Sequence, residues 1–159
     1  RHVDMPVRIV GESNKEWIEH FMQDAPINLS VEGPVTGKDR SELLRRAKAM
    51  LMPTLYTEPF GGAGVEGTLC GTPLIASDFG AFSETVQHGW NGFRCKTLGD
   101  WLSAIKSVPN LNRRAISADA RSRYSLDHCG QQMDKIFRQI KGLDGKGWYS
   151  LEPTHAIWE

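Results

Sequence analysis

The sequence predicts an α/β domain in which a Rossmann-like parallel sheet is covered by helices on both faces. Short, almost wholly apolar segments alternate along the chain with longer segments in which apolar residues recur at helical spacing. This alternation is typical of parallel sheets that are buried on both faces. Hydrophobic residues make up 40% and charged residues 24% of the 159 residues, which is typical of a globular domain with a real core. We expect one domain over residues 1–142 and a tail without clear periodicity over residues 143–159.

The predicted strands are short and aliphatic, and each is closed by glycine, proline or a polar residue. They cover residues 6–10, 27–31, 49–53, 73–77 and 91–95. The predicted helices cover residues 13–24, 38–48, 64–70, 81–87, 99–107, 112–123 and 125–142. Ser13 and Ser125 can accept hydrogen bonds at the N-termini of the first and last of these helices. We expect the strands to form one sheet that binds its ligand beyond their carboxyl ends.

The charges and the cysteines exclude several classes of partner and site. Nineteen basic and nineteen acidic side chains cancel, so nothing indicates a surface for nucleic acid or for an anionic membrane. No apolar stretch is long enough to cross a bilayer. Cys70, Cys95 and Cys129 form no metal-ligand pattern with the histidines, so we expect no metal site and buried, reduced thiols. Reduced thiols indicate a cytoplasmic protein, with peripheral membrane attachment of the full-length protein left open.

Residues 53–73, which read PTLYTEPFGGAGVEGTLCGTP, are the most informative stretch. They follow a predicted buried strand and enter a predicted helix. Gly61, Gly62 and Gly64 remove side chains where the helix begins, which would allow a ligand to approach the backbone. The first amides of a helix have no intrahelical partner and lie at the positive end of the helix dipole, so they favour a phosphate group. The alternative is a glycine-rich turn that needs only backbone freedom.

Two carboxylates flank this loop, Glu58 before it and Glu66 eight residues later. A carboxylate can accept hydrogen bonds from two neighbouring hydroxyls, so one acid toward each end of a diphosphate would suit a sugar–diphosphate–ribose ligand. The alternatives are structural, with Glu66 as a partner of the helix dipole and Glu58 as a solvated turn residue. Asp78 and Glu84 are interpreted as charges near a helix N-terminus, and His88 as a residue at a helix end.

In this order the residues resemble the signature of the group 1 glycosyltransferases, also called family 4, which have the GT-B fold. The resemblance rests on E-P-F-G at 58–61, on C-G-T-P at 70–73 and on the spacing of the two glutamates. Further blocks match in order on either side, namely IVGE at 9–12, VEGPV at 31–35, SELLRRAKAMLMP at 41–53, IASD at 75–78 and HGWNGF at 88–93. The resemblance covers residues 6–140.

The resemblance implies the donor-binding half of a retaining transferase that moves a sugar from a nucleotide diphosphate to an acceptor. The sugar nucleotide is a substrate, and no cofactor is expected. The acceptor would be a glycan, a glycolipid or a small molecule. Glu58 takes the catalytic position, beside the hydroxyls of the donor sugar. The donor-binding positions are Glu66 for the ribose, the backbone amides around Phe60, Gly61 and Gly62 for the sugar and phosphates, and Gly33 and Pro34 for the base.

Two departures from the family pattern affect these expectations. Gly67 stands where the family usually has alanine, so the helix is expected to start late or loosely. The chain begins after the family's glycine-arginine-lysine region, whose cations hold the diphosphate, and it lacks the N-terminal acceptor domain. No lysine or arginine lies between Lys48 and Arg94, which leaves Arg8 and Lys38 as substitute cations to consider. We therefore expect no transfer by this chain alone.

Other functions remain open for the same residues, because one α/β fold hosts many activities. The enzyme alternatives are a sugar-nucleotide epimerase or a phosphorylase of the same fold. The non-enzyme alternative is a nucleotide- or nucleotide-sugar-binding module without catalytic activity.

Overall fold

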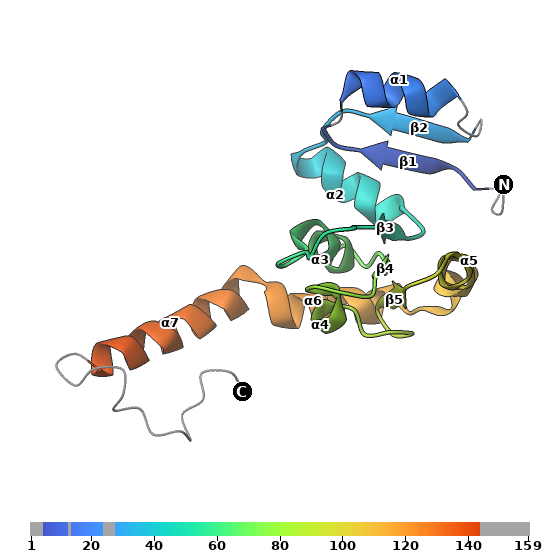
Figure 1. The fold of residues 1–159 in the computed structure, drawn as a ribbon. Coiled ribbons are helices and arrows are strands. Elements are labelled where there is room, and N and C mark those ends of the chain that lie inside the picture. Colours follow the sequence, from blue (N-terminus) through green and yellow to red (C-terminus); the bar gives the residue numbers. More distant parts are fainter. Residues whose placement is uncertain (1–4, 13, 24–27, 144–159) are drawn as a thin grey trace.

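The computed structural model describes residues 5–12, 14–23 and 28–143 (Figure 1). The strands are β1 (Val7–Val10), β2 (Leu29–Glu32), β3 (Met50–Met52), β4 (Leu74–Ser77) and β5 (Gly92–Cys95). The α-helices are α1 (Lys15–Gln23), α2 (Gly37–Arg46), α3 (Gly62–Leu69), α4 (Phe82–Thr85), α5 (Leu98–Ser107), α6 (Arg113–Tyr124) and α7 (Leu126–Gly142). A 3₁₀ turn, η1 (Val108–Asn110), follows α5. Ser13, Ile27 and the tail after residue 143, which also entered the sequence analysis, lie outside the described residues.

The strands pair in parallel, as predicted, and helices connect them in alternation. The structure differs from the expectation of one continuous sheet. β1 pairs with β2, and β3, β4 and β5 form a second sheet in that order. In Figure 1, α2 lies between the two sheets. The alternation of apolar segments predicts which segments become strands. Which strands pair with each other depends on long-range contacts, which the local sequence pattern does not report.

The core of the three-stranded sheet is built on β4, whose residues are all buried. Leu74 and Ala76 point to one face, where Phe82 and Val86 bury them. Ile75 points to the other face, where it packs among other side chains. These are Cys95, Ala104 and Val108, with Phe93, Trp101 and Ile105 partly buried beside them. The residues of α4 and α5 therefore cover opposite faces, which confirms the predicted layering.

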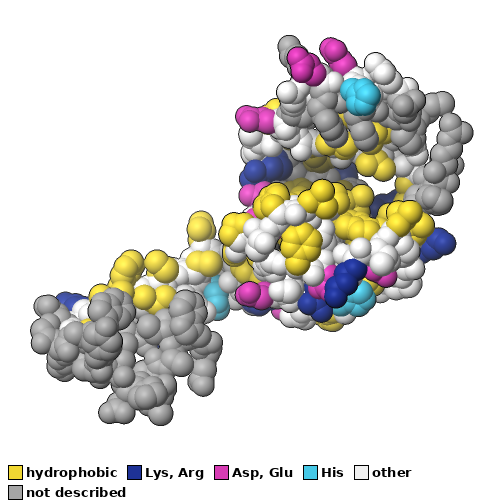
Figure 2. All heavy atoms as spheres, in the orientation of Figure 1, with side chains coloured by type: hydrophobic (Ala, Val, Ile, Leu, Met, Phe, Trp, Pro, Cys, Tyr) yellow, Lys and Arg dark blue, Asp and Glu magenta, His cyan; other side chains and the backbone are white. Residues whose placement is uncertain are grey.

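Helix α7 is predicted well in extent but differs in burial. Ser125 accepts a hydrogen bond at its N-terminus from the His128 amide at 3.3 Å, as expected of an N-cap. None of its described residues is buried, and its apolar side chains lie exposed along the helix (Figure 2). The expectation of buried cysteines holds for Cys95, whereas Cys70 is half-buried and Cys129, on α7, is exposed. Burial and the nearby Asp100 and Asp78 carboxylates raise the pKa of the Cys95 thiol to about 11.

The C-termini of α2 and α3 are held side by side by polar groups of α6. The guanidinium of Arg113 donates to the carbonyls of Ala47 at 2.6 Å and Arg45 at 2.7 Å, and it lies 3.1 Å from the Thr72 hydroxyl. Ser117 donates to the carbonyl of Leu69, at the end of α3, at 2.7 Å. Helix ends leave carbonyls without intrahelical partners, so a cation that binds them satisfies these groups and complements the helix dipole.

None of the helices in the described part of the chain is both long enough and apolar enough to cross a membrane.

Replacing Arg113 should destabilise the fold more than its position at a helix start would suggest. Hydrogen bonds that involve a charged group are worth about 1.5–3 kcal/mol, and Arg113→Ala removes several, so we expect a loss of at least about 2 kcal/mol in the free energy of unfolding. Urea denaturation measures it. The neighbouring exposed Arg114 is the control, since Arg114→Ala should stay within about 0.5 kcal/mol of the parent. Equal effects of the two changes would contradict the proposed capping role.

Candidate functional site

Helix α3 begins just beyond the carboxyl end of β3, where the sequence predicts a ligand site. Its N-cap residue, Gly61, has φ +75° and ψ +43°, in the left-handed region that favours glycine. The first intrahelical bond runs from the Val65 amide to the Gly61 carbonyl at 3.1 Å. The amides of residues 62–64 belong to the first turn and have no intrahelical acceptor. Gly62 and Ala63 are exposed, so part of this N-terminus faces outward.

Two of the glycines at the start of α3 have a packing role that the sequence analysis did not predict. A Cβ atom on Gly61 would lie 2.7 Å from the Phe82 ring, and one on Gly64 would lie 2.7 Å from Leu74 Cδ2. Gly61 thus allows close packing against Phe82 of α4 and Gly64 against Leu74 of β4, and only Gly62 of the three is exposed. The expectation that α3 starts late is wrong, because the left-handed Gly61 allows the helix to begin at Gly62.

Gly67 also belongs to this packed face. A Cβ atom there would lie 3.0 Å from the sulfur of Met50 on β3. The absence of a side chain at Gly67 therefore allows α3 to pack closely against β3.

Glu58 is half-buried in the loop between β3 and α3, and both of its carboxylate oxygens accept hydrogen bonds. The Tyr56 hydroxyl donates to Oε2 at 2.7 Å, and the Gly61 amide donates to Oε1 at 2.9 Å. The Tyr56 bond is the largest cause of a lowered pKa of the Glu58 carboxyl, followed by the Gly61 amide. Desolvation opposes the shift, and the Phe60 amide adds to it. The same bond raises the pKa of Tyr56. Glu58 is therefore an ordered carboxylate that is ionised at neutral pH, and not merely a solvated turn residue.

The backbone of Glu58 is held by the next loop along the sheet. The Ala81 amide donates to the Glu58 carbonyl at 2.9 Å. Gly80, with φ +62°, lies so close that a Cβ atom would be 2.8 Å from the Glu58 nitrogen. The Ser77 hydroxyl donates to the Thr54 carbonyl at 2.9 Å. The loops that follow β3 and β4 thus form one connected edge of the site.

Glu66 lies in the second turn of α3 and pairs with a cation from another helix. Arg40, on α2, donates from Nη2 to Glu66 Oε1 at 2.8 Å. The exposed fractions of the two side chains are 50% and 40%, so the pair is open to solvent. Because Glu66 is beyond the first turn and has this specific partner, the helix-dipole role is not needed to explain it.

The remaining predicted residues lie around these acids. Phe60 is 54% exposed and contacts Tyr124 edge-to-face, with ring centroids 6.3 Å apart. Gly33 and Pro34 are exposed in the loop between β2 and α2, and a Cβ atom on Gly33 would meet nothing within 4 Å. The substitute cations differ, since Arg8 binds Glu32 through two nitrogens, at 2.7 and 2.5 Å, whereas Lys38 is exposed on α2.

Sequence reasoning missed Arg40 as a site residue. Arg40 is one of several basic residues that helical spacing places on the outer face of α2. Nothing in that pattern distinguishes it from Arg45 or Arg46.

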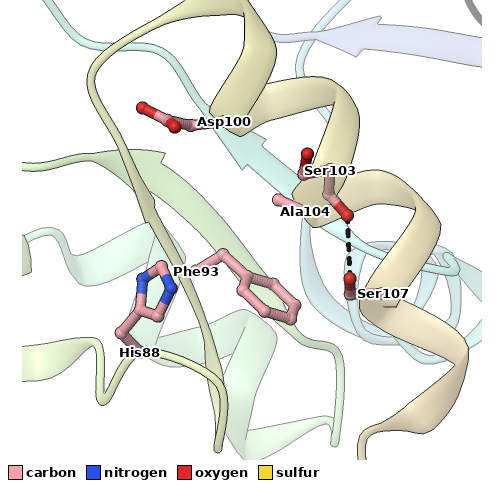
Figure 3. Close-up of a pocket in the computed structure, with 6 residues that line it drawn as sticks. All are labelled: His88, Phe93, Asp100, Ser103, Ala104 and Ser107. Carbon is pink, nitrogen blue, oxygen red and sulfur yellow. Dashed lines mark hydrogen bonds between the residues drawn. The ribbon is translucent and has the colours of Figure 1, made fainter.

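Asp78, beyond the carboxyl end of β4, has ion-pair partners on the neighbouring strand and beyond it. The Arg94 guanidinium lies 3.5 Å and the Lys96 ammonium 3.4 Å from its oxygens. A pocket of about 190 Å³ lies between β5 and α5 and has no lining residue from α3. Its lining residues are His88, Phe93, Asp100, Ser103, Ala104 and Ser107 (Figure 3).

His88, Asp100 and Ser107 of that pocket already have structural partners. His88 Nδ1 accepts from the Arg94 amide at 3.2 Å, and Ser107 donates to the Ser103 carbonyl at 2.9 Å. Asp100 accepts from the amides of Lys96 and Thr97 in a capping box, and these bonds lower the pKa of Asp100. We therefore place the candidate site at α3 and not in this pocket.

A glycine that packs and a glycine that is open should respond differently to alanine. Gly61→Ala forces a side chain into the left-handed region, at about 1–2 kcal/mol, and against the buried Phe82 ring, at about 1–3 kcal/mol more. We expect thermal unfolding to show a loss of at least about 2 kcal/mol. Gly62→Ala, in open space on the same helix, should be neutral or slightly stabilising. Similar losses for both variants would contradict the packing assignment.

Several known proteins that resemble this chain in sequence are glycosyltransferases or glycogen synthases. The glycogen synthase of Mycobacterium tuberculosis is 37% identical over 122 residues, which are 74% of this chain and 29% of that protein. The D-inositol 3-phosphate glycosyltransferase of Pseudarthrobacter chlorophenolicus is 30% identical over 113 residues, 67% of this chain and 27% of that protein. The chain thus spans less than a third of the length of these two relatives.

Solved structures show the same fold at low sequence identity. The Anabaena protein HepE, solved with UDP and glucose, superposes with a TM-score of 0.72 at 21% identity, over 84% of this chain and 40% of that one. AviGT4, a glycosyltransferase involved in avilamycin A biosynthesis, gives 0.70 at 19% identity, over 85% and 43% of the two chains. The fold is therefore the α/β arrangement found in GT-B glycosyltransferases. The family model for group 1 glycosyl transferases matches residues 1–122, and the chain belongs to that family.

Proposed function

We propose that this chain is the donor-binding half of a retaining glycosyltransferase, and that it binds a nucleotide-diphosphate sugar at the N-terminus of α3. The observation that carries the proposal is the position of this N-terminus, where Gly62 and Ala63 are exposed and the hydrogen-bonded carboxylates of Glu58 and Glu66 lie on either side. HepE, which shares the fold, was solved with UDP and with UDP-glucose.

The diphosphate would lie on the amides around Phe60, Gly61 and Gly62. Helix N-termini bind phosphate through free N–H groups and the helix dipole. The Gly61 amide already donates to Glu58, so the first-turn amides of the exposed residues Gly62 and Ala63 are the expected phosphate donors. Main-chain groups of Gly33 and Pro34 would contact the base, and Glu66 would accept hydrogen bonds from the ribose hydroxyls.

Glu58 would face the donor sugar. Each carboxylate oxygen has two acceptor positions, so Oε1 and Oε2 can accept from a sugar hydroxyl while they stay bonded to Gly61 and Tyr56. The bonds that lower its pKa keep it negative as positive charge develops on the sugar carbon. The acceptor would then attack from the face that the diphosphate leaves, which retains the anomeric configuration.

Replacement of the two glutamates should have different effects on the affinities for nucleotide and sugar nucleotide. Glu66→Ala should weaken a free nucleoside diphosphate and its sugar nucleotide by similar factors of at least about tenfold, because it removes charge-assisted hydrogen bonds to the ribose. Glu58→Ala should leave the free nucleoside diphosphate nearly unaffected and weaken the sugar nucleotide. Calorimetric titration with UDP, GDP and ADP and their glucose conjugates measures both effects, and melting curves show whether each variant is folded.

Glu42 provides the matched control for these titrations. It is an exposed glutamate on α2 that pairs with Arg45 at 3.5 Å, so Glu42→Ala removes the same charge outside the proposed site. If Glu66→Ala lowered the melting temperature without changing affinity, Glu66 would be only a structural residue. Equal losses of free nucleotide in both site variants would contradict the division of roles.

The purified 159-residue chain should bind nucleotide weakly and transfer no sugar, because acceptor binding and further phosphate-binding cations are expected from a separate part of the protein. A coupled assay of nucleotide release with UDP-glucose and a panel of acceptors tests this. Multiple turnovers would contradict it.

Addition of EDTA should leave the nucleotide-binding isotherm unchanged, since the proposed contacts use amides and carboxylates and not a divalent ion.

A further inference from the structure

We propose that Arg40 is a positioning residue, which holds the Glu66 carboxylate in the orientation that distinguishes a ribose from a sugar lacking its hydroxyls. This inference rests on the proposed function, because it assumes that Glu66 binds the ribose. It adds a residue for which neither the sequence pattern nor the comparisons give a role. The observation is the 2.8 Å bond from Arg40 Nη2 on α2 to Glu66 Oε1 on α3, which joins two residues 26 positions apart in the sequence.

Because the Arg40–Glu66 pair is exposed, we expect it to orient the Glu66 carboxylate and to add little to the stability of the fold. Both side chains are about half exposed, and ion pairs in such a position contribute little to folding. A glutamate side chain has three rotatable bonds, so without a partner its oxygens sample many positions. A guanidinium bound at Oε1 restricts them and leaves Oε2, with the second acceptor position of Oε1, to meet a pair of hydroxyls.

The same arrangement occurs at the other acid of the site. Glu58 is held by the Tyr56 hydroxyl and the Gly61 amide, both from its own loop. Glu66 lies on a helix face and receives its donor from α2 instead. Each carboxylate that flanks the phosphate-binding turn is thus restrained by a donor before any ligand is bound, which reduces the entropy lost on binding.

Helix α2 is itself anchored well enough for this task. Its C-terminal carbonyls are bound by Arg113, and the Thr72 hydroxyl donates to the Leu44 carbonyl. Arg40 lies in the first turns of α2, directly after the loop that carries Gly33 and Pro34. A base at that loop and a ribose at Glu66 would therefore have Arg40 beside them.

A competing role for Arg40 is direct contact with the diphosphate. A phosphate contact would strengthen every nucleotide regardless of its ribose hydroxyls, whereas positioning of Glu66 affects only ligands that carry them. The two roles therefore predict different responses to a nucleotide without the 2′ and 3′ hydroxyls.

The experiment compares a nucleoside diphosphate with its 2′,3′-dideoxy analogue by calorimetric titration of the 159-residue chain. The base is the one among UDP, GDP and ADP that binds most tightly. The parent should prefer the ribonucleotide by at least about tenfold, and Glu66→Ala should abolish this preference. Arg40→Ala should lower the preference at least about fivefold while the affinity for the dideoxy analogue changes less than about twofold. Arg40→Lys should retain an intermediate preference, because a lysine keeps the charge but not the planar fork.

Arg46 supplies the charge-matched control, since it is exposed on the same helix. Arg46→Ala should leave both affinities unchanged. The double variant Arg40→Ala with Glu66→Ala should behave as Glu66→Ala alone. If Arg40→Ala were unfolded by circular dichroism, Arg40→Gln would replace it in the same titrations.

Two results would overturn the inference. An equal loss for the ribonucleotide and the dideoxy analogue would make Arg40 a phosphate or general charge contact. An unchanged preference in a folded Arg40→Ala protein would show that Glu66 needs no positioning. A different result, an unchanged preference in Glu66→Ala, would instead remove the ribose from Glu66 and so contradict the proposed function itself.

Discussion

The site depends on how closely α3 approaches the sheet beneath it. Gly61, Gly64 and Gly67 recur every third residue, and Cβ atoms there would lie 2.7 to 3.0 Å from Phe82, Leu74 and Met50. Since the interior is packed at near-crystalline density, a side chain at Gly61 or Gly64 would require the helix or its neighbour to shift, and one at Gly67 would require the Met50 side chain to move slightly. The position of the helix N-terminus, and of the carboxylates before and within the helix, follows from this contact. The glycines thus determine where the first-turn amides and the two carboxylates lie.

Hydrogen bonds from the neighbouring loops and from α6 also hold the segments around α3 in place. The loop that carries Glu58 is bonded to the loop after β4 through Ala81 and Ser77. On the opposite side, Arg113 and Ser117 of α6 hold the ends of α2 and α3. These contacts join segments that are far apart in the chain, so the site is a product of the tertiary structure and not of the glycine-rich loop alone. The conformational entropy lost when these segments are ordered is offset mainly by burial of the apolar core around β4.

The sequence predicts the local part of this arrangement and misses the long-range part. The strands around β4 and the extent of α7 follow from apolar periodicity and a serine cap, which are local signals. The predicted start of α3 is two residues late, because the pattern does not report that Gly61 adopts a left-handed conformation. The donors to Glu66 and to the C-terminus of α2 come from Arg40 and Arg113, which are 26 and up to 68 residues from their partners. No spacing rule links residues at such separations, so neither contact could be predicted.

The charges of the described site suggest where nucleotide affinity would come from. Several cations near the sheet already face carboxylates, since Arg40 pairs with Glu66, and Arg94 and Lys96 pair with Asp78. A diphosphate between Glu58 and Glu66 would therefore be attracted mostly by the partial charges of the first amides of α3, which are weaker than a full cation. The ribose and base contacts would then supply most of the binding energy in this chain. The orientation of the Glu66 carboxylate would then have a large effect on nucleotide affinity. If its oxygens were misplaced, the ribose hydroxyls would be left without hydrogen-bond partners, and the phosphate contacts would not compensate for that loss.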